Sequence, residues 1–108
     1  MKKTDEAEID GLLADLWKRN LPLLQERVTL LESAAAAAAG GTLNGAARAE
    51  ALGVAHKLSG SLGMFGYHHG TAIAREIELL LSIPGPNKPA DHLSILVADL
   101  RRTLFPES

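Results

Sequence analysis

Large apolar residues recur at helical spacing along most of the chain. In residues 5–19 they are separated by three and four positions, which places them on one stripe of an amphipathic helix. Because proline belongs in the first turn of a helix and not in its interior, Pro22 predicts a break, with Asn20 as the cap of a new helix. That second helix is expected over 21–39, and the adjacent glycines at 40–41 end it.

Three further helices follow the same pattern. The spacing predicts them over 45–64, 68–82 and 91–104, with Asn44 as the cap of the first. No segment shows the sustained alternation of a strand, and short connections favour antiparallel neighbours. We therefore predict an all-α fold: an antiparallel up-and-down four-helix bundle with a short extra helix at the N-terminus, in one domain covering 1–108.

Composition narrows the class of protein. The chain has 108 residues, with 11 basic and 13 acidic side chains, so a general nucleic-acid binder is disfavoured. The absence of cysteine excludes a disulfide framework, a thiolate metal site and a cysteine nucleophile. No apolar run approaches the roughly 18 residues of a membrane span, and no signal-peptide core follows the basic start. We expect a soluble, cytoplasmic domain without membrane insertion.

The segment 54–66 carries the residues of chemical interest. On a helix, His56 falls opposite the apolar stripe of this segment, and Gly53, Gly60 and Gly63 flank it. Each glycine inside a helix costs about 0.5–1 kcal/mol relative to alanine, so three glycines on one face need a reason. One explanation is that they let the backbone of another protein approach the imidazole. The other is close packing of helices through small residues, with the histidine incidental.

The opposite side of this helix is the predicted core stripe. Its members share one face at about 100° per residue. They are Ala47, Ala51, Val54, Leu58, Ser61 and Phe65.

An exposed histidine suits phosphoryl transfer. An imidazole titrates at about pH 6.5, so a large share of histidine side chains is neutral at neutral pH. A neutral ring nitrogen is a nucleophile. The reaction needs mainly positioning and neutralisation of charge on the phosphate oxygens. We assign support of the phosphate to Lys57, Ser59 and Gly60, with Lys57 as the cation and Ser59 as a neutral hydrogen-bond donor.

The sequence around residue 56 resembles the histidine-containing phosphotransfer (Hpt) family of bacterial phosphorelays. The family pattern has leucine two residues after the histidine, followed by lysine, glycine and two small residues, and another glycine ten residues after the histidine. The matching residues are His56, Leu58, Gly60, Ser61 and Gly66. The chain departs from the pattern at Ser59, where the family usually has lysine, and at Leu62, where a small residue is expected.

The resemblance implies that His56 is the phosphoacceptor, at Nε2, and that it exchanges a phosphoryl group with an aspartate of a response-regulator receiver domain. It also implies a hybrid sensor histidine kinase as a partner, Mg²⁺ supplied by the receiver, and neither kinase activity nor an ATP site in this chain. We assign docking of the receiver to the small and apolar residues around the histidine, and we expect a monomer. The docking residues are Leu52, Gly53, Gly60, Gly63 and Met64.

The other titratable residues suggest no second site. Adjacent histidines such as His68 and His69 point about 100° apart on a helix, whereas helical metal pairs are spaced by three or four, so these residues and His92 predict no metal. Glu76 and Glu78 lie on different faces of one helix and do not form a hydrolytic carboxylate pair.

Two functions from other classes stay open. The first is a bundle that binds a receiver without taking the phosphate, which the serine at position 59 keeps possible. The second is a helical dimerisation module that uses the small-residue face. Phosphorylation of His56 separates phosphotransfer from both.

Overall fold

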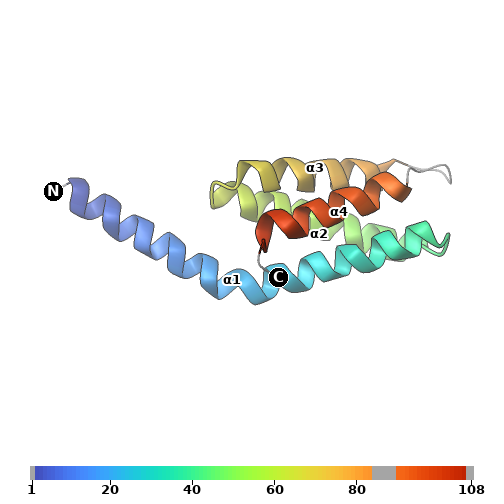
Figure 1. Cartoon of the computed structure of the whole chain (residues 1–108), viewed down its shortest axis with the longest axis horizontal. Helices are drawn as coiled ribbons and strands as arrows, with labels where there is room; N and C mark the ends of the chain where they lie inside the picture. Colours follow the sequence, from blue (N-terminus) through green and yellow to red (C-terminus); the bar gives the residue numbers. More distant parts are fainter. Residues whose placement is uncertain (1, 84–89, 107–108) are drawn as a thin grey trace.

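The computed structural model describes the backbone of residues 2–83 and 90–106, and the side chains of residues 9, 11–83 and 91–106. Four helices account for most of this described part, and they run up and down beside one another (Figure 1). They are α1 (Lys2–Ala39), α2 (Gly45–Met64), α3 (His68–Ser82) and α4 (Ala90–Leu104). Each helix packs against the next along the chain, and α4 closes the ring against α1. The predicted all-α bundle is confirmed.

The predicted separation of an extra N-terminal helix is wrong, because α1 continues through Pro22. Asn20 starts no new helix; its side-chain Nδ2 donates to the carbonyl of Leu16 at 3.0 Å, one turn earlier. A proline inside a helix removes one N–H from the ladder and crowds the preceding turn, which bends the helix. Figure 1 shows α1 bending in its middle, so that its N-terminal part leaves the other three helices.

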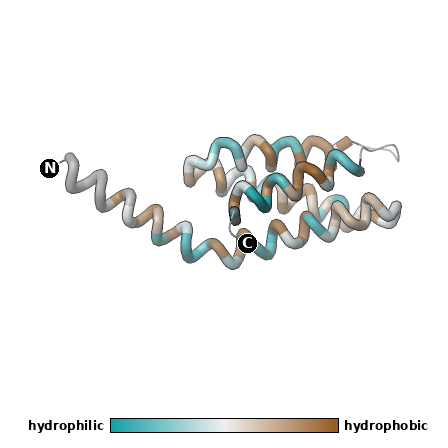
Figure 2. The backbone as a smooth tube through the Cα atoms, in the orientation of Figure 1, coloured by the Kyte–Doolittle hydropathy of each residue, from teal (hydrophilic) through white to brown (hydrophobic). Residues whose placement is uncertain are grey.

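The core between the four helices consists of leucine, isoleucine, valine and alanine. In the described parts of the helices, apolar and hydrophilic residues follow one another along the chain, as Figure 2 shows. Burying one large aliphatic side chain contributes about 1.5–3 kcal/mol, so this core supplies the main stabilisation of the fold. The large side chains that are most fully buried are Leu24, Val28, Leu31, Leu58, Leu62, Ile77 and Leu100.

Two residues define the ends of α2. Asn44 caps its start as predicted, because the side-chain oxygen accepts a hydrogen bond from the backbone N–H of Ala47 at 2.8 Å. At the other end Gly66 has a φ of +80°, a conformation that residues with a Cβ rarely adopt. This lets the N–H of Tyr67 donate to the carbonyl of Leu62 at 2.9 Å and turns the chain into α3.

Aromatic rings fix α1 to the turn between α2 and α3. The ring of Trp17 stacks on Tyr67 with centroids 4.3 Å apart and meets the edge of Phe65 at 5.2 Å. Such pairs are worth about 0.5–1.5 kcal/mol beyond the area that they bury. This cluster therefore closes one end of the bundle.

Two arginines join helices that are distant in sequence. Arg101 of α4 donates two hydrogen bonds to the carboxylate of Glu32 of α1, from Nε at 2.6 Å and from Nη2 at 3.1 Å. Arg48 of α2 points Nη1 at the carbonyls of Leu81 and Ile83, each 3.5 Å away, at the end of α3. A cation suits the C-terminal end of a helix, and α3 has no basic residue of its own in its last turn.

Candidate functional site

His56 stands in the middle of α2 with its side chain 74% exposed. Its neighbours Ala55 and Leu58 are fully buried and hold this part of the helix against the core. The imidazole is therefore carried by a rigid element and open to a partner. This placement agrees with the prediction that His56 points away from the core.

A carboxylate on α3 orients the imidazole. The Nδ1 atom of His56 lies 2.9 Å from Oε2 of Glu78, whose side chain is 31% exposed. A carboxylate only accepts hydrogen bonds, so this contact favours the tautomer with the proton on Nδ1. The lone pair of the neutral ring is then on Nε2, to which no described residue makes a hydrogen bond. The geometry leaves one nucleophilic nitrogen uncommitted.

Glu78 is the site residue that sequence reasoning missed. The signal was the hairpin itself: α2 and α3 are antiparallel and joined by a short turn at Gly66. In such a hairpin a residue ten positions before the turn lies near residues ten to twelve positions after it. That register brings the region of Glu76 and Glu78 opposite His56.

The glycines around His56 are not required by packing within the chain. A Cβ added at Gly53 or Gly60 would meet nothing within 4 Å, and one at Gly63 would meet only Oγ1 of Thr71 at 3.8 Å. Close helix packing inside the bundle is therefore the wrong explanation for the first two. These glycines keep side chains off the surface beside the imidazole.

A glycine with close neighbours within the chain lies elsewhere. A Cβ at the buried Gly70 would come within 3.2 Å of Cδ1 of Leu62 and 3.5 Å of Cδ2 of Leu104. Leu62, which departs from the small residue expected at its position, is fully buried. The larger side chain at this position therefore packs in the core and does not lie on the surface around His56.

The five residues predicted to dock a partner share the side of α2 that carries His56, within about 80° around the helix axis. Gly53, Gly60 and Gly63 are exposed, and Met64 is 67% exposed. Leu52 is half-buried and packs against the core. The docking role itself stays a prediction.

Ser59, which was predicted to support the phosphate, lies on the buried side of α2. Ser59 is 9% exposed, and its hydroxyl donates to the backbone carbonyl of His56 at 2.8 Å. Lys57, in contrast, is exposed, and no ion pair joins it to another residue in the described part of the chain. Of the two polar neighbours expected to support a phosphate, only Lys57 is exposed, and its supporting role stays a prediction.

The buried face of α2 is turned relative to the predicted core stripe. Val54 and Ser61 from that stripe are half-buried, whereas Ala51 and Leu58 are buried as predicted. The physical reason is the packing of α2 on α3, which covers the side of the helix that carries Ser59. The buried residues of α2 are Ala51, Ala55, Leu58, Ser59 and Leu62.

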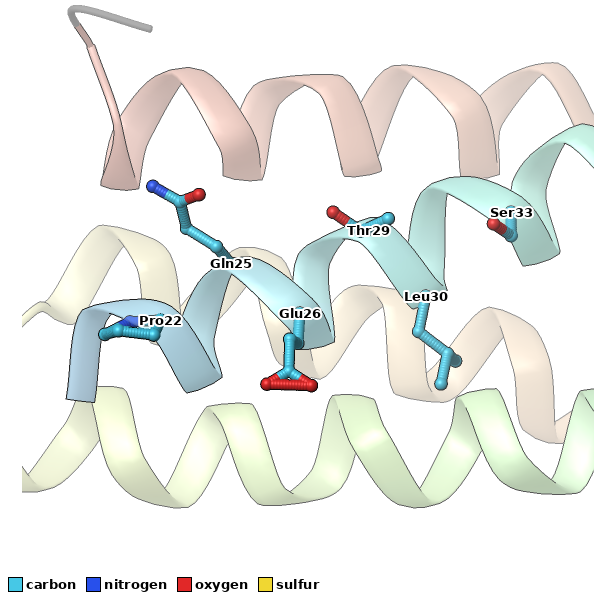
Figure 3. A pocket seen from close by; sticks show the side chains of 6 residues that line it. All are labelled: Pro22, Gln25, Glu26, Thr29, Leu30 and Ser33. Atoms are coloured by element: carbon cyan, nitrogen blue, oxygen red, sulfur yellow. The ribbon is translucent and has the colours of Figure 1, made fainter.

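A shallow hollow of about 630 Å³ beside α1 is a second place to consider (Figure 3). Its lining side chains all come from that one helix and include a single titratable group, Glu26. One carboxylate without a second titratable group offers no chemistry to compete with His56. The lining residues are Pro22, Gln25, Glu26, Thr29, Leu30 and Ser33.

Comparison with known families decides the classification. The model of the Hpt domain family matches residues 15–103. The chain belongs to the Hpt domain family. The Hpt resemblance around residue 56 is thereby confirmed, while no curated protein and no solved structure matches the chain.

Hpt domains carry out histidine phosphotransfer in phosphorelays, where they interact with receiver domains and kinases. They are phosphocarriers without kinase activity of their own. In this Hpt domain, the described residues contain no group of three histidine, cysteine or acidic side chains that could hold a metal. Likewise, none of its described helices is long and apolar enough to cross a membrane.

Proposed function

We propose that this Hpt domain accepts a phosphoryl group on Nε2 of His56 from an aspartate of a response-regulator receiver domain, and returns it to such an aspartate. The observation that carries the proposal is the 2.9 Å contact between Nδ1 of His56 and Oε2 of Glu78. It commits one ring nitrogen and leaves the other as a nucleophile on a side chain that is 74% exposed.

The transfer step balances without an added base. The Nε2 lone pair attacks phosphorus, the N–P bond forms, and the P–O bond to the aspartate breaks, so that the aspartate leaves as a carboxylate. The ring keeps its proton on Nδ1 and becomes positively charged. The carboxylate of Glu78 then faces a cation, which strengthens the hydrogen bond. Glu78 is therefore a positioning residue that also favours the phosphorylated ring.

Charge on the phosphate oxygens needs compensation from both partners. Lys57 supplies a cation from this chain, about 100° around the helix from His56. Mg²⁺ bound by the receiver supplies the rest, and this domain adds no cofactor. The absent side chain at Gly60 leaves room for the phosphoryl group, whereas Ser59 takes no part because its hydroxyl is held by a backbone carbonyl.

The receiver docks on the side of α2 that carries His56. The glycines at 53, 60 and 63 allow its backbone to come close, and the half-buried Leu52 and exposed Met64 offer apolar contact. Transient signalling contacts of this kind often bury less than about 1,200 Å² in total. An exposed helix face on which glycines recur over several turns suits such a contact.

The test is the intact mass of the protein after incubation with a small-molecule phosphoramidate and, separately, with a phosphorylated receiver. We expect one acid-labile phosphate from either donor, absent in His56→Gln and retained in His92→Gln, which changes an exposed histidine of α4. Phosphorus NMR of the product should show substitution at Nε2.

Phosphate that persists in His56→Gln would overturn the assignment of the acceptor. Absence of phosphate from both donors, with receiver binding retained, would favour a bundle that binds receivers without taking the phosphate. Phosphate from the phosphoramidate alone would contradict the choice of partner and leave His56 as the nucleophile.

A further inference from the structure

Arg75 is the only lysine or arginine in α3, and its side chain is exposed. No ion pair joins it to another residue in the described part of the chain. An exposed guanidinium is most often a solvated surface charge, so only its position in the fold can assign it a role. That position is beside the imidazole of His56.

The edge of α3 that borders the exposed face of α2 carries Arg75. Glu78 marks this edge, because its Oε2 lies 2.9 Å from Nδ1 of His56. Thr71 marks it nearer the start of α3, because its Oγ1 would lie 3.8 Å from a Cβ at Gly63. At about 100° per residue, Thr71 and Glu78 lie about 20° apart around α3, and Arg75 lies about 40–60° from them, toward solvent. Arg75 therefore shares the open surface of the helix pair with the imidazole.

Arg75 is close enough to act on a group carried by the ring. It precedes Glu78 by three residues, and side chains at this spacing are neighbours on a helix, with Cβ atoms about 5–6 Å apart. Because Glu78 contacts the ring of His56, a guanidinium that reaches this carboxylate also reaches the surroundings of the ring. The glycine at position 60 keeps the adjoining turn of α2 free of a side chain.

α2 itself supplies no cation on the side of His56 that faces α3. On that side it has Ser59, which is buried and whose hydroxyl donates to the carbonyl of His56. Lys57 lies about 100° around α2 in the other direction. A phosphoryl group on the ring would thus have a cation on one side only, unless α3 provides the second.

We propose that the guanidinium of Arg75 donates hydrogen bonds to the oxygens of the phosphoryl group on Nε2 of His56, both as the group arrives and while it stays on the ring. This inference rests on the proposed phosphotransfer function and adds a catalytic residue from a second helix. Lys57 and Arg75 then approach the phosphoryl group from opposite sides.

The chemistry of a guanidinium suits this role. Its N–H donors form a planar fork that matches the oxygens of a phosphate, and its charge is retained throughout the reaction. The bond changes of the transfer are unaffected: the N–P bond forms, the P–O bond to the aspartate of the receiver breaks, and Arg75 keeps its protons. Arg75 only offsets charge on the oxygens, which is the main requirement of phosphoryl transfer.

The first test measures the rate at which His56 takes phosphate from a small-molecule phosphoramidate, followed by intact mass, with no receiver present. Arg75→Ala should slow this rate about tenfold, since it removes a charged hydrogen-bond donor. Arg75→Lys should lose less, because it keeps the charge and gives up only the planar fork. Arg102→Ala, which removes an arginine of α4 with a 70% exposed side chain, is the matched control and should react normally. Circular dichroism checks that each variant folds.

The second test reads the contact directly by nitrogen NMR of the arginine Nε–H groups. The Arg75 signal, identified by its absence in Arg75→Lys, should shift when His56 becomes phosphorylated by the phosphoramidate. The signal of Arg102 should stay in place. A merely structural role of Arg75 would leave its signal unmoved.

An unchanged rate in Arg75→Ala would overturn the proposal, and so would an Arg75 signal that ignores phosphorylation. A loss as large in Arg75→Lys as in Arg75→Ala would contradict the role of charge. Slower transfer from a phosphorylated receiver alone, with normal reaction of the phosphoramidate, would show that Arg75 contacts the receiver and not the phosphoryl group. If the unchanged chain takes no phosphate from either donor, the proposed function fails and this inference fails with it. The other three outcomes, with phosphate on the unchanged chain, remove only the role of Arg75.

Discussion

α2 has two faces that are both rich in small residues. The size of the residues on the inner face is limited by the neighbouring helices, whereas no contact within the chain limits it at Gly53 and Gly60 on the outer face. On the inner face Ala55, Leu58 and Leu62 are fully buried, and the size of each is set by the helices that touch it. On the outer face Gly53 and Gly60 have open space where a side chain would stand. The fold itself explains the first face and gives no reason for the second. A residue that costs stability and contacts nothing points to a requirement from outside the chain.

The largest expected effect on phosphotransfer concerns the outer face. Gly60→Gln should reduce phosphate transfer from a receiver by about a hundredfold or more, since it places a side chain where the proposed complex brings the backbone of the receiver close. This corresponds to about 2.7 kcal/mol. Phosphorylation by the smaller phosphoramidate should change little. Intact mass over time with the two donors measures both rates.

Ala98→Gln, at an exposed position of α4, is the matched control and should transfer normally. Equal loss with both donors would mean that the glycine acts on the histidine itself and not on docking. Normal transfer from the receiver by a folded Gly60→Gln would remove this face from the interface.

On the inner face, Leu58→Ala should lower the free energy of unfolding by about 2–5 kcal/mol, because Leu58 is fully buried and truncation leaves a cavity. That is a large part of the roughly 5–15 kcal/mol available to a domain. Urea denaturation followed by circular dichroism measures the change. The rate of phosphorylation should stay near that of the unchanged protein while the variant remains folded, which contrasts with Gly60→Gln.

The contact between Glu78 of α3 and Nδ1 of His56 links the packing of the helices to the chemistry of the imidazole. Glu78→Ala should slow phosphorylation of His56 about tenfold, the equivalent of one hydrogen bond to a charged group. Glu76→Ala, an exposed carboxylate two residues earlier, is the control. Phosphoramidate kinetics measure both, and the nitrogen NMR signals of the imidazole should show loss of the Nδ1–H tautomer in Glu78→Ala only. Unchanged kinetics and tautomer would contradict the positioning role.

The smallest expected effects are on the free energy of unfolding, and they come from replacing two glycines by alanine. Gly53→Ala should raise the free energy of unfolding by about 0.5–1 kcal/mol, because the added methyl meets nothing and helix propensity improves. Gly70→Ala should gain less or lose stability, since its Cβ would sit 3.2 Å from Leu62. Paired denaturation curves measure the difference. A stabilised Gly70→Ala and a destabilised Gly53→Ala would reverse the comparison.

The bundle and the exposed position of His56 could be predicted from the sequence for a shared reason. Both depend on strong local patterns: apolar spacing of three and four in α3 and α4, the cap at Asn44, and the glycine at 66. The exposure of His56 follows from helix geometry alone once α2 is placed. The order of helices and the candidate histidine therefore needed no tertiary information.

What could not be predicted depends on contacts between helices. Pro22 was expected to end a helix by a local rule, but the chain on its C-terminal side packs into the core at Leu24 and Val28, which holds the helix through a bend. In α2, alanine and glycine occur on every side, so the sequence does not define which side α3 covers. Ser59 was misplaced for that reason, and Glu78 was missed because its partner lies on another helix.

Under the proposed function, the contact between Nδ1 of His56 and Glu78 would also make the domain sensitive to its own phosphorylation. If Glu78 favours the phosphorylated ring, then by thermodynamic linkage the phosphate must favour the packing of α3 against α2 by the same free energy. Local opening of this helix pair should become rarer when the phosphate is on and more frequent when it leaves. Slower exchange of the backbone amide hydrogens around residues 56 and 78 would record that change, so the two helices would act as a readout of the relay.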